Sequence, residues 1–141
     1  YKHEECCRPK STTTKYVYYY LCFTIDKDRL GMSRKVFVES MIKEGVPLGE
    51  GGYMPVYLQP MYQKKIAFGT KGFPFTADYY GKEISYAKGI CPIAEKMWFE
   101  DLFYVQVQNY VPTDEQINKF KLAAEKVINY LDEINKHFLE D

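Results

Sequence analysis

The stretch from Gly49 to Gly89 constrains the fold of this 141-residue chain more than any other feature. It is rich in Gly, Pro, Tyr and Phe, with brief apolar patches and no sustained helical or strand periodicity. It is too aromatic for a disordered linker and too irregular for one long element. Irregular segments of this length in a compact domain usually serve a function. We therefore expect this one either to form a binding surface or to pack against another domain.

Regular secondary structure is predicted on the N-terminal side of this segment. Residues 15–25, KYVYYYLCFTI, are aromatic and β-branched without Gly or Pro, which is typical of a central strand covered on both faces. Ser33 is suited to cap a helix over 34–44, and Gly45 supplies its stop before an extended piece at 46–48. The helical spacing predicts a face made of Val36, Phe37, Ser40 and Met41.

The C-terminal side predicts a helix, a strand and a long final helix. Proline near the start favours a helix over 92–101, and the alternation in 103–108, FYVQVQ, indicates a strand with one polar face. Thr113 and Gln116 have the spacing of a capping box. The helix that they begin is predicted to continue to Asn135. Its apolar stripe comprises Ile117, Phe120, Ala124, Val127, Ile128, Leu131 and Ile134.

Element order and charge narrow the possible classes of protein. Strand, helix, short strand, irregular segment, helix, strand and long helix is an α+β order. The 19 basic and 19 acidic residues cancel, so no overall field attracts nucleic acid or anionic lipid. The longest apolar stretch, around 16–25, is shorter than the roughly 20 residues that span a bilayer. We expect a protein that binds neither nucleic acid nor membrane.

The four cysteines favour a reduced, cytoplasmic protein. Cys6 and Cys7 are adjacent, and no pair shows the C-x-x-C spacing, which fits neither a disulfide framework nor a zinc site. Metal binding by Cys6, Cys7 and His3 is the alternative, although adjacent cysteines rarely both reach one ion.

The first fifteen residues, YKHEECCRPKSTTTK, resemble neither a signal peptide nor a folded element. They begin with Tyr1 instead of methionine and have no apolar periodicity. We expect the chain to be cut from a longer polypeptide. Residues 1–14 are then an irregular linker from a missing large domain, and 15–141 form the folded small domain.

Lys43 raises the question of a covalently bound cofactor, because it lies a few residues before Gly-Glu-Gly-Gly at 49–52. Catalysis by pyridoxal phosphate needs a lysine amine that condenses with the cofactor aldehyde, and nearby glycines let the backbone come close. Lys43 also lies in the last turn of a predicted helix, where the negative end of the helix dipole favours a cation. We interpret it as a helix-ending lysine.

Five motifs follow one another along residues 15–136. In chain order they are YVYYYLCFTID, SRKVFVESMIKEGVPLG, GYMPVYLQPMYQ, KGICPIAEKMWFEDLF and VPTDEQINKF. Each motif is weak alone, but the set in this order is fairly specific. It resembles the C-terminal small domain of the DegT/StrS family of pyridoxal-phosphate-dependent sugar aminotransferases.

The resemblance implies a fold and a parent enzyme. The fold is the small domain of the aspartate-aminotransferase-like fold, with a small, mostly antiparallel sheet packed with helices and a long C-terminal helix. The parent is a homodimer that transfers an amino group, typically from glutamate, to a nucleotide-linked keto sugar or a related cyclic polyol. Its Schiff-base lysine and pyridoxal phosphate belong to the large domain. This fragment is expected to contain no catalytic residue, to bind no cofactor or metal, and to be inactive alone.

The resemblance also implies a substrate-binding role for Tyr53, Tyr57 and Gln59, with Pro55 and Pro60 shaping their loop. Tyrosine suits such a role, because it offers a flat apolar face to a sugar or base and a hydroxyl to a sugar oxygen. The alternative is that these tyrosines fill an irregular core.

The CPIAE segment is interpreted as structural. Pro92 sets the helix start, Cys91 lies at the cap, and Glu95 in the first turn favours the positive helix end. Trp98 and Phe99 are expected either in the core or at a face that docks on the missing domain.

Two other functions are compatible with the same pattern. In the first, the chain is a stand-alone α+β module that binds sugars or peptides through 49–89. In the second, it is a domain that only structures an oligomer interface.

Overall fold

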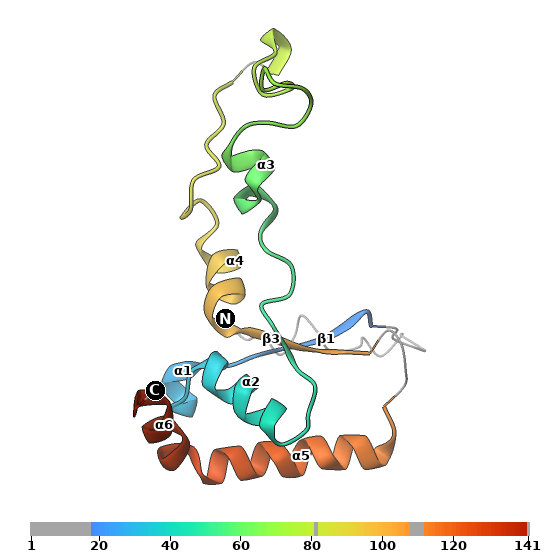
Figure 1. Ribbon diagram of the computed structural model, residues 1–141, viewed down its shortest axis with the longest axis vertical. Coiled ribbons are helices and arrows are strands. Elements are labelled where there is room, and N and C mark those ends of the chain that lie inside the picture. The colour runs from blue at the N-terminus through green and yellow to red at the C-terminus, as the bar shows by residue number, and fades with distance from the viewer. Residues whose placement is uncertain (1–17, 81, 108–111, 141) are drawn as a thin grey trace, which may run out of the picture.

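The computed structural model describes residues 18–80, 82–107 and 112–140, which form a mixed α+β fold (Figure 1). A small antiparallel sheet carries helices on one face, and a long arm rises on the other side of the sheet. We define the arm as residues 52–91. The predicted α+β class is confirmed. The expected linker at 1–14 and the alternative metal site at His3, Cys6 and Cys7 lie outside the described residues.

The sheet has the strand order β1-β3-β2, with β1 at Tyr20–Thr24, β2 at Gly49–Glu50 and β3 at Leu102–Gln106. Both pairings are antiparallel. The prediction of a central first strand covered on both faces is wrong for the described residues, because β1 pairs only with β3 and lies at an edge. Its alternate side chains Cys22 and Thr24 are exposed.

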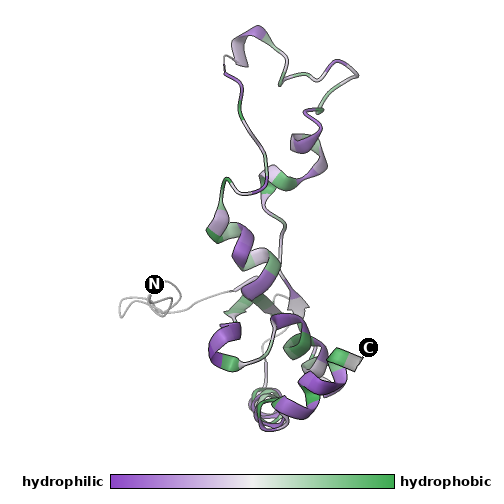
Figure 2. Ribbon diagram, turned by 90° about the vertical axis from the view of Figure 1, so that its left-hand side faces the viewer, coloured by the Kyte–Doolittle hydropathy of each residue, from purple (hydrophilic) through white to green (hydrophobic). Residues whose placement is uncertain are grey.

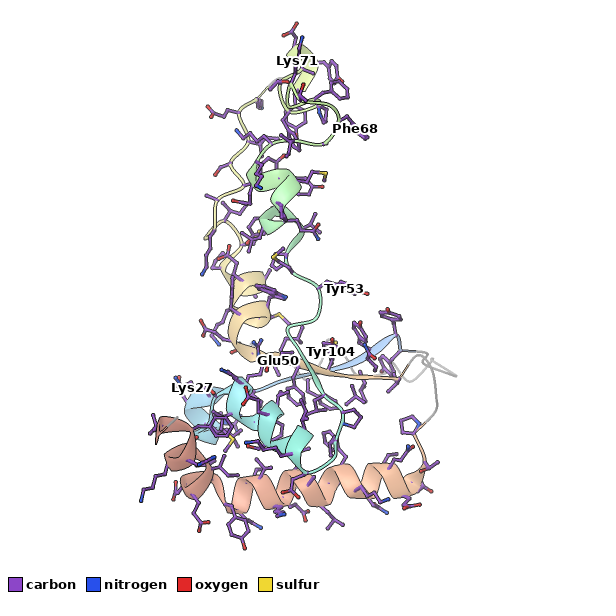
Figure 3. The ribbon with its side chains drawn as sticks, in the orientation of Figure 1. Lys27, Glu50, Tyr53, Phe68, Lys71 and Tyr104 are labelled. Carbon is purple, nitrogen blue, oxygen red and sulfur yellow. The ribbon has the colours of Figure 1, made fainter. Side chains whose placement is uncertain are left out.

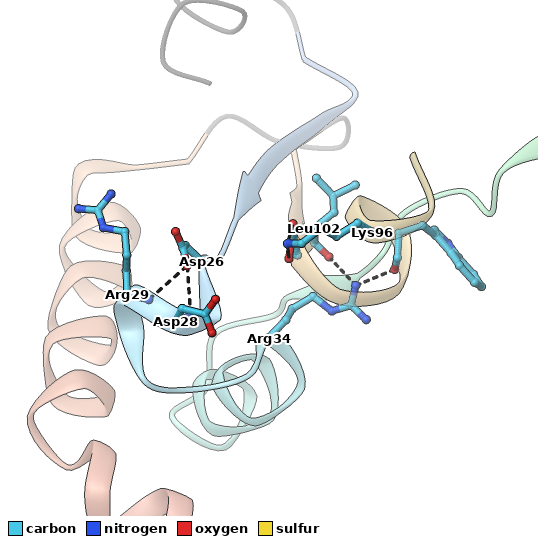
Figure 4. A network of polar contacts seen from close by, with 8 residues as sticks. Asp26, Asp28, Arg29, Arg34, Lys96 and Leu102 are labelled. Carbon is cyan, nitrogen blue, oxygen red and sulfur yellow. Dashed lines mark hydrogen bonds and ion pairs between the residues drawn. The ribbon is translucent and has the colours of Figure 1, made fainter. Parts of the chain in front are cut away.

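The helix α2 (Arg34–Lys43) begins and ends almost where predicted. Ser33 accepts a hydrogen bond from the Val36 backbone N–H, and the helix continues to Lys43 before Gly45 adopts a positive φ of 85°. A short helix, α1 (Lys27–Leu30), precedes it and is capped by the Asp26 carboxylate (Figure 4). The core between the helices and the sheet comprises Ile25, Met32, Phe37, Val38, Met41, Phe103, Ala123 and Val127.

The final helix is divided, which corrects the prediction of one helix to Asn135. The capping box of Thr113 and Gln116 begins α5 (Asp114–Asn129), and α6 (Leu131–Glu140) follows after a break at Tyr130. The break turns α6 toward α1, where the Asn135 amide donates to the Gly31 carbonyl at 2.8 Å (Figure 1). Leu131 and Ile134 pack against the core from this second helix. Within the predicted stripe, Ile117 and Ile128 are instead exposed.

The arm confirms the prediction of a long irregular segment. Its regular pieces are one-turn elements, η2 (Val56–Leu58), α3 (Pro60–Gln63) and η3 (Asp78–Tyr80). Figure 2 shows it extending away from the sheet and helices, with apolar and polar residues mixed along it. Exposed apolar side chains on the arm include Val56, Ile66, Phe68, Phe73, Tyr79, Ile84 and Ile90. An aromatic group inside its far half joins Tyr62, Phe75, Tyr80 and Tyr86.

The chain returns from the arm to the sheet through one continuous helical segment. It comprises α4 (Pro92–Lys96) and a π-helical turn, η4 (Met97–Asp101), which leads directly into β3. The predicted end near Asp101 is therefore confirmed. None of the helices in the described residues has the length and apolar character that a membrane span requires.

Candidate functional site

Three stacked tyrosine rings mark the place where the arm leaves the sheet. The Tyr20 ring lies 4.2 Å from the Tyr104 ring and 5.9 Å from the Tyr53 ring between centroids, with interplanar angles of 28° and 30°. The Tyr53 hydroxyl also donates to the Tyr19 hydroxyl at 3.3 Å. We call Tyr104, Tyr20 and Tyr53 the tyrosine row. Figure 3 shows Tyr53 near the base of the arm and above Tyr104.

The strand register explains why these rings meet. Side chains alternate between the two faces of a strand, and directly opposed residues share a face. Tyr20 opposes Gln106, and Tyr104 opposes both Cys22 on β1 and Gly49 on β2. A Cβ atom on Gly49 would collide with the Tyr104 ring, so a side chain at this position would force that ring to move. The row therefore lies on the sheet face opposite the helices.

The hydroxyls of the row perturb one another. Hydrogen bonding with Tyr53, and next with Tyr19, lowers the pKa of Tyr20. The same contacts, first with Tyr19 and then with Tyr20, raise the pKa of Tyr53. Burial is the main cause that raises the pKa of Tyr104.

Tyr57 belongs to a different contact. Its hydroxyl donates to Oε1 of Glu95, and the same oxygen accepts from the Gly89 backbone N–H at 2.6 Å. Glu95 is buried in α4 with 6% of its surface exposed. This contact joins the outgoing and returning segments of the arm. The Tyr57 hydroxyl therefore already has a hydrogen-bond partner within the protein.

Gln59 lies at the start of α3, is exposed, and makes no capping hydrogen bond with its side chain. The neighbouring amide of Gln63 instead ties the arm together, donating to the carbonyls of Tyr57 at 2.7 Å and Tyr86 at 2.5 Å. The resemblance implies that Tyr53, Tyr57 and Gln59 bind substrate. Of these three residues, only Tyr53 belongs to the tyrosine row.

Arg34 connects α2 to the two segments that flank the arm. Its Nη1 donates to the carbonyls of Trp98 at 2.7 Å and Leu102 at 3.2 Å (Figure 4). Its Nη2 pairs with Glu50 at 3.0 Å. The sequence did not predict this contact.

Trp98 and Phe99 pack on each other, with ring centroids 4.6 Å apart. The Lys88 ammonium lies 4.2 Å from the centroid of the Phe99 ring, which is exposed.

Lys43 ends α2, as predicted, and side chains of both charges surround it. The Lys43 ammonium lies 5.1 Å over the Phe138 ring, beside a cavity of about 300 Å³. That cavity adjoins the C-terminal end of α2, whose partial negative charge disfavours a phosphate. Two carboxylates, Glu44 and Glu133, also line it, and Glu44 already binds Lys126 at 2.8 Å. Lys126 and His137 line the same cavity, so its charges are mixed, and Lys43 stays interpreted as a helix-ending lysine.

Comparison of the chain with models of protein families, with curated proteins and with solved structures finds no match. The function must therefore be argued from the motifs and contacts of the chain itself.

The Glu95 contact makes a prediction about acid stability. The Tyr57 hydroxyl, followed by the Gly89 N–H, lowers the pKa of Glu95, whereas burial and then Glu95 raise the pKa of Tyr57 to about 12. A lowered carboxyl pKa stabilises the fold above the pKa of the unfolded chain, and this stabilisation is lost as the pH falls through the folded value. Tyr57→Phe should therefore reduce the free energy of unfolding at pH 7, by an amount that shrinks below about pH 4.

Urea unfolding of the wild type and of Tyr57→Phe across this pH range measures the difference. Tyr79→Phe is the control, because its exposed ring packs against Phe73, and it should give no pH-dependent difference. A Tyr57→Phe effect that is constant from pH 7 to pH 3 would contradict the assignment to an ionised Glu95.

Proposed function

We propose that the chain is the C-terminal small domain of a DegT/StrS-family aminotransferase with an aspartate-aminotransferase-like fold. The parent protein aminates a nucleotide-linked keto sugar or a related cyclic polyol, using pyridoxal phosphate held by a large domain. The small domain forms a wall of the substrate cleft. The proposal rests on the order of the five motifs. It includes that the parent protein is a cytoplasmic homodimer.

One structural observation carries the proposal: long-range contacts of the chain connect the motif residues to one another. Arg34 of SRKVFV binds the Trp98 carbonyl of the CPIAEKMWFEDLF motif. Tyr57 of GYMPVYLQP binds Glu95 of that same motif. Both contacts pair residues of different motifs, as expected of motifs that form one structural unit. The contacts therefore support reading the motifs as one inherited unit.

The arm gives the second support. Large apolar side chains such as Phe68 and Tyr79 are more than two-thirds exposed on a segment that extends away from the core (Figure 3). Extended apolar surfaces of this kind indicate an interaction partner. The proposal assigns this partner as the large domain of the same chain, which would lie against the arm and face Tyr53 at its base.

The first test reads the coding sequence upstream of Tyr1. We expect a frame of about 200 further residues, the size of a domain, with its own serine, aromatic and lysine segment. The longer protein should transfer an amino group from glutamate to a nucleotide-linked keto sugar. The 141-residue chain alone should show no turnover.

A matched pair of lysine variants in the longer protein sharpens the test. Lys43→Arg should retain activity, because Lys43 only ends α2, whereas arginine at the upstream lysine should abolish it. Turnover by the 141-residue chain alone would overturn the proposal. A frame that opens with methionine just before Tyr1 would also overturn it, in favour of a stand-alone binding module.

A further inference from the structure

The tyrosine row ends in a ring whose outer side is open. Tyr104 is held between Gly49 and Tyr20, and Tyr20 lies between Tyr104 and Tyr53. Tyr53 is 73% exposed, although its hydroxyl is held by Tyr19. The stack therefore fixes the orientation of Tyr53 from one side and leaves its other side accessible among the described residues.

The described residues that share the sheet face of the row are uncharged. By register, the sheet face that bears the row presents Tyr20, Cys22, Thr24, Gly49, Leu102, Tyr104 and Gln106. The pocket of about 260 Å³ beside Tyr104 is lined by Pro47, Leu48, Gly49, Tyr104 and Gln106, which are also uncharged. A phosphate or carboxylate needs a cation or a cluster of N–H donors. This face therefore favours a neutral group.

The geometry of the stack favours a flat ring over a puckered one. Adjacent rings of the row are tilted from parallel by only 28° and 30°, so another planar ring can continue the stack on Tyr53 with offset contact. Nucleobases bind exposed aromatic side chains in this way with little dependence on sequence. The hydroxyls of Tyr19 and Tyr53 supply donors and acceptors for the edge of the base.

We propose that the outer face of Tyr53 stacks with the nucleobase of a nucleotide ligand. This inference rests on the proposed function, which supplies a nucleotide-linked substrate, and it names the part of that substrate that the small domain binds. Tyr20 and Tyr104 are positioning residues that hold Tyr53 in place.

The test is a calorimetric titration of the 141-residue chain with uridine 5′-monophosphate and guanosine 5′-monophosphate. Ribose 5-phosphate, which lacks the base, is the matched probe. We expect saturable binding of at least one nucleotide and none of ribose 5-phosphate. Tyr53→Ala should weaken nucleotide binding by about tenfold, the scale of one base stacked on an aromatic side chain.

Two variants isolate the stacking contribution. Tyr53→Phe keeps the ring and should retain most of the affinity. Tyr79→Ala removes a ring that is 75% exposed but lies elsewhere on the arm, and it should bind as the wild type does. Equal loss in Tyr53→Ala and Tyr79→Ala would overturn the proposal, as would binding of ribose 5-phosphate equal to that of the nucleotides, or no nucleotide binding at all.

The outcome is separable from that of the proposed function. If the longer protein aminates its substrate but this chain binds no nucleotide, only the proposed stacking of a nucleobase on Tyr53 is overturned. Nucleotide binding that depends on Tyr53, with no amination by the longer protein, overturns only the aminotransferase assignment.

Discussion

Gly51→Ala is expected to destabilise the fold by roughly 2–4 kcal/mol, because two costs coincide at this residue. Gly51 is buried with a φ of 68°, a conformation that costs an L-residue about 1–2 kcal/mol. An added Cβ would also lie 2.8 Å from the Trp98 carbonyl oxygen. That oxygen is a backbone atom and accepts the Arg34 hydrogen bond, so it cannot move without disturbing the base of the arm.

Gly69→Ala separates the two costs. Gly69 has nearly the same φ, 65°, but a Cβ there would meet nothing within 4 Å. Its substitution should therefore cost only the conformational share, about 1 kcal/mol. Urea unfolding of both variants gives the comparison. Equal destabilisation by the two substitutions would show that contact with Trp98 contributes nothing.

Local sequence signals predicted the parts of the fold that local interactions decide. The Ser33 cap and the capping box of Thr113 and Gln116 each satisfy helix donors within one turn, and both helices start where these residues indicate. The irregular composition of 49–89 likewise corresponds to the arm, because no periodic face was available there to pack a regular element.

Errors arose where distant contacts decide the structure. The spacing of Leu131 and Ile134 continues the period of α5, so the sequence alone cannot distinguish one helix from two. The break at Tyr130 is favoured by tertiary contacts of α6, including the bond from Asn135 to Gly31, 104 residues away. The position of β1 at the sheet edge likewise depends on β3, which enters the sheet about 80 residues later.

The candidate site divides in the same way. Tyr53 was named from a motif, but its partners Tyr20 and Tyr104 follow only from the register between β1 and β3. Alternation in each strand indicated which residues share a face, yet it did not indicate which strands pair. Arg34 belongs to a motif, but its partners gave no signal, because two of them are backbone carbonyls, which any residue type supplies.

Arg34→Ala should reduce the free energy of unfolding by roughly 3 kcal/mol. The Arg34 side chain is only 10% exposed, and its removal takes a donor from the carbonyls of Trp98 and Leu102 in a partly buried site. The Leu102 carbonyl still accepts from the Gly51 N–H at 2.8 Å, so the larger share of the loss falls on the Trp98 carbonyl. Glu50 contributes less to this loss, because 33% of its side chain is exposed to solvent, where ion pairs are weak. Urea unfolding measures the total change.

Two further variants divide the contribution of Arg34. Glu50→Gln removes the ion pair alone and should cost less than about 1 kcal/mol. Arg34→Lys keeps the positive charge but loses the fork that reaches two carbonyls and a carboxylate at once, so it should fall between the other two variants. An Arg34→Ala cost no larger than that of Glu50→Gln would mean that the two carbonyl bonds contribute nothing to stability.

The single tryptophan of the chain reports whether the loss occurs at the base of the arm. Trp98 provides the carbonyl nearest to Arg34, and its indole lies next to Gly51. If Arg34 fixes this junction, Arg34→Ala should shift Trp98 fluorescence to longer wavelength in the folded protein, before global unfolding begins. An unshifted spectrum with the full loss of stability would place the damage elsewhere, in the packing of α2 against the sheet. The arm would then keep its position at Tyr53 without the arginine.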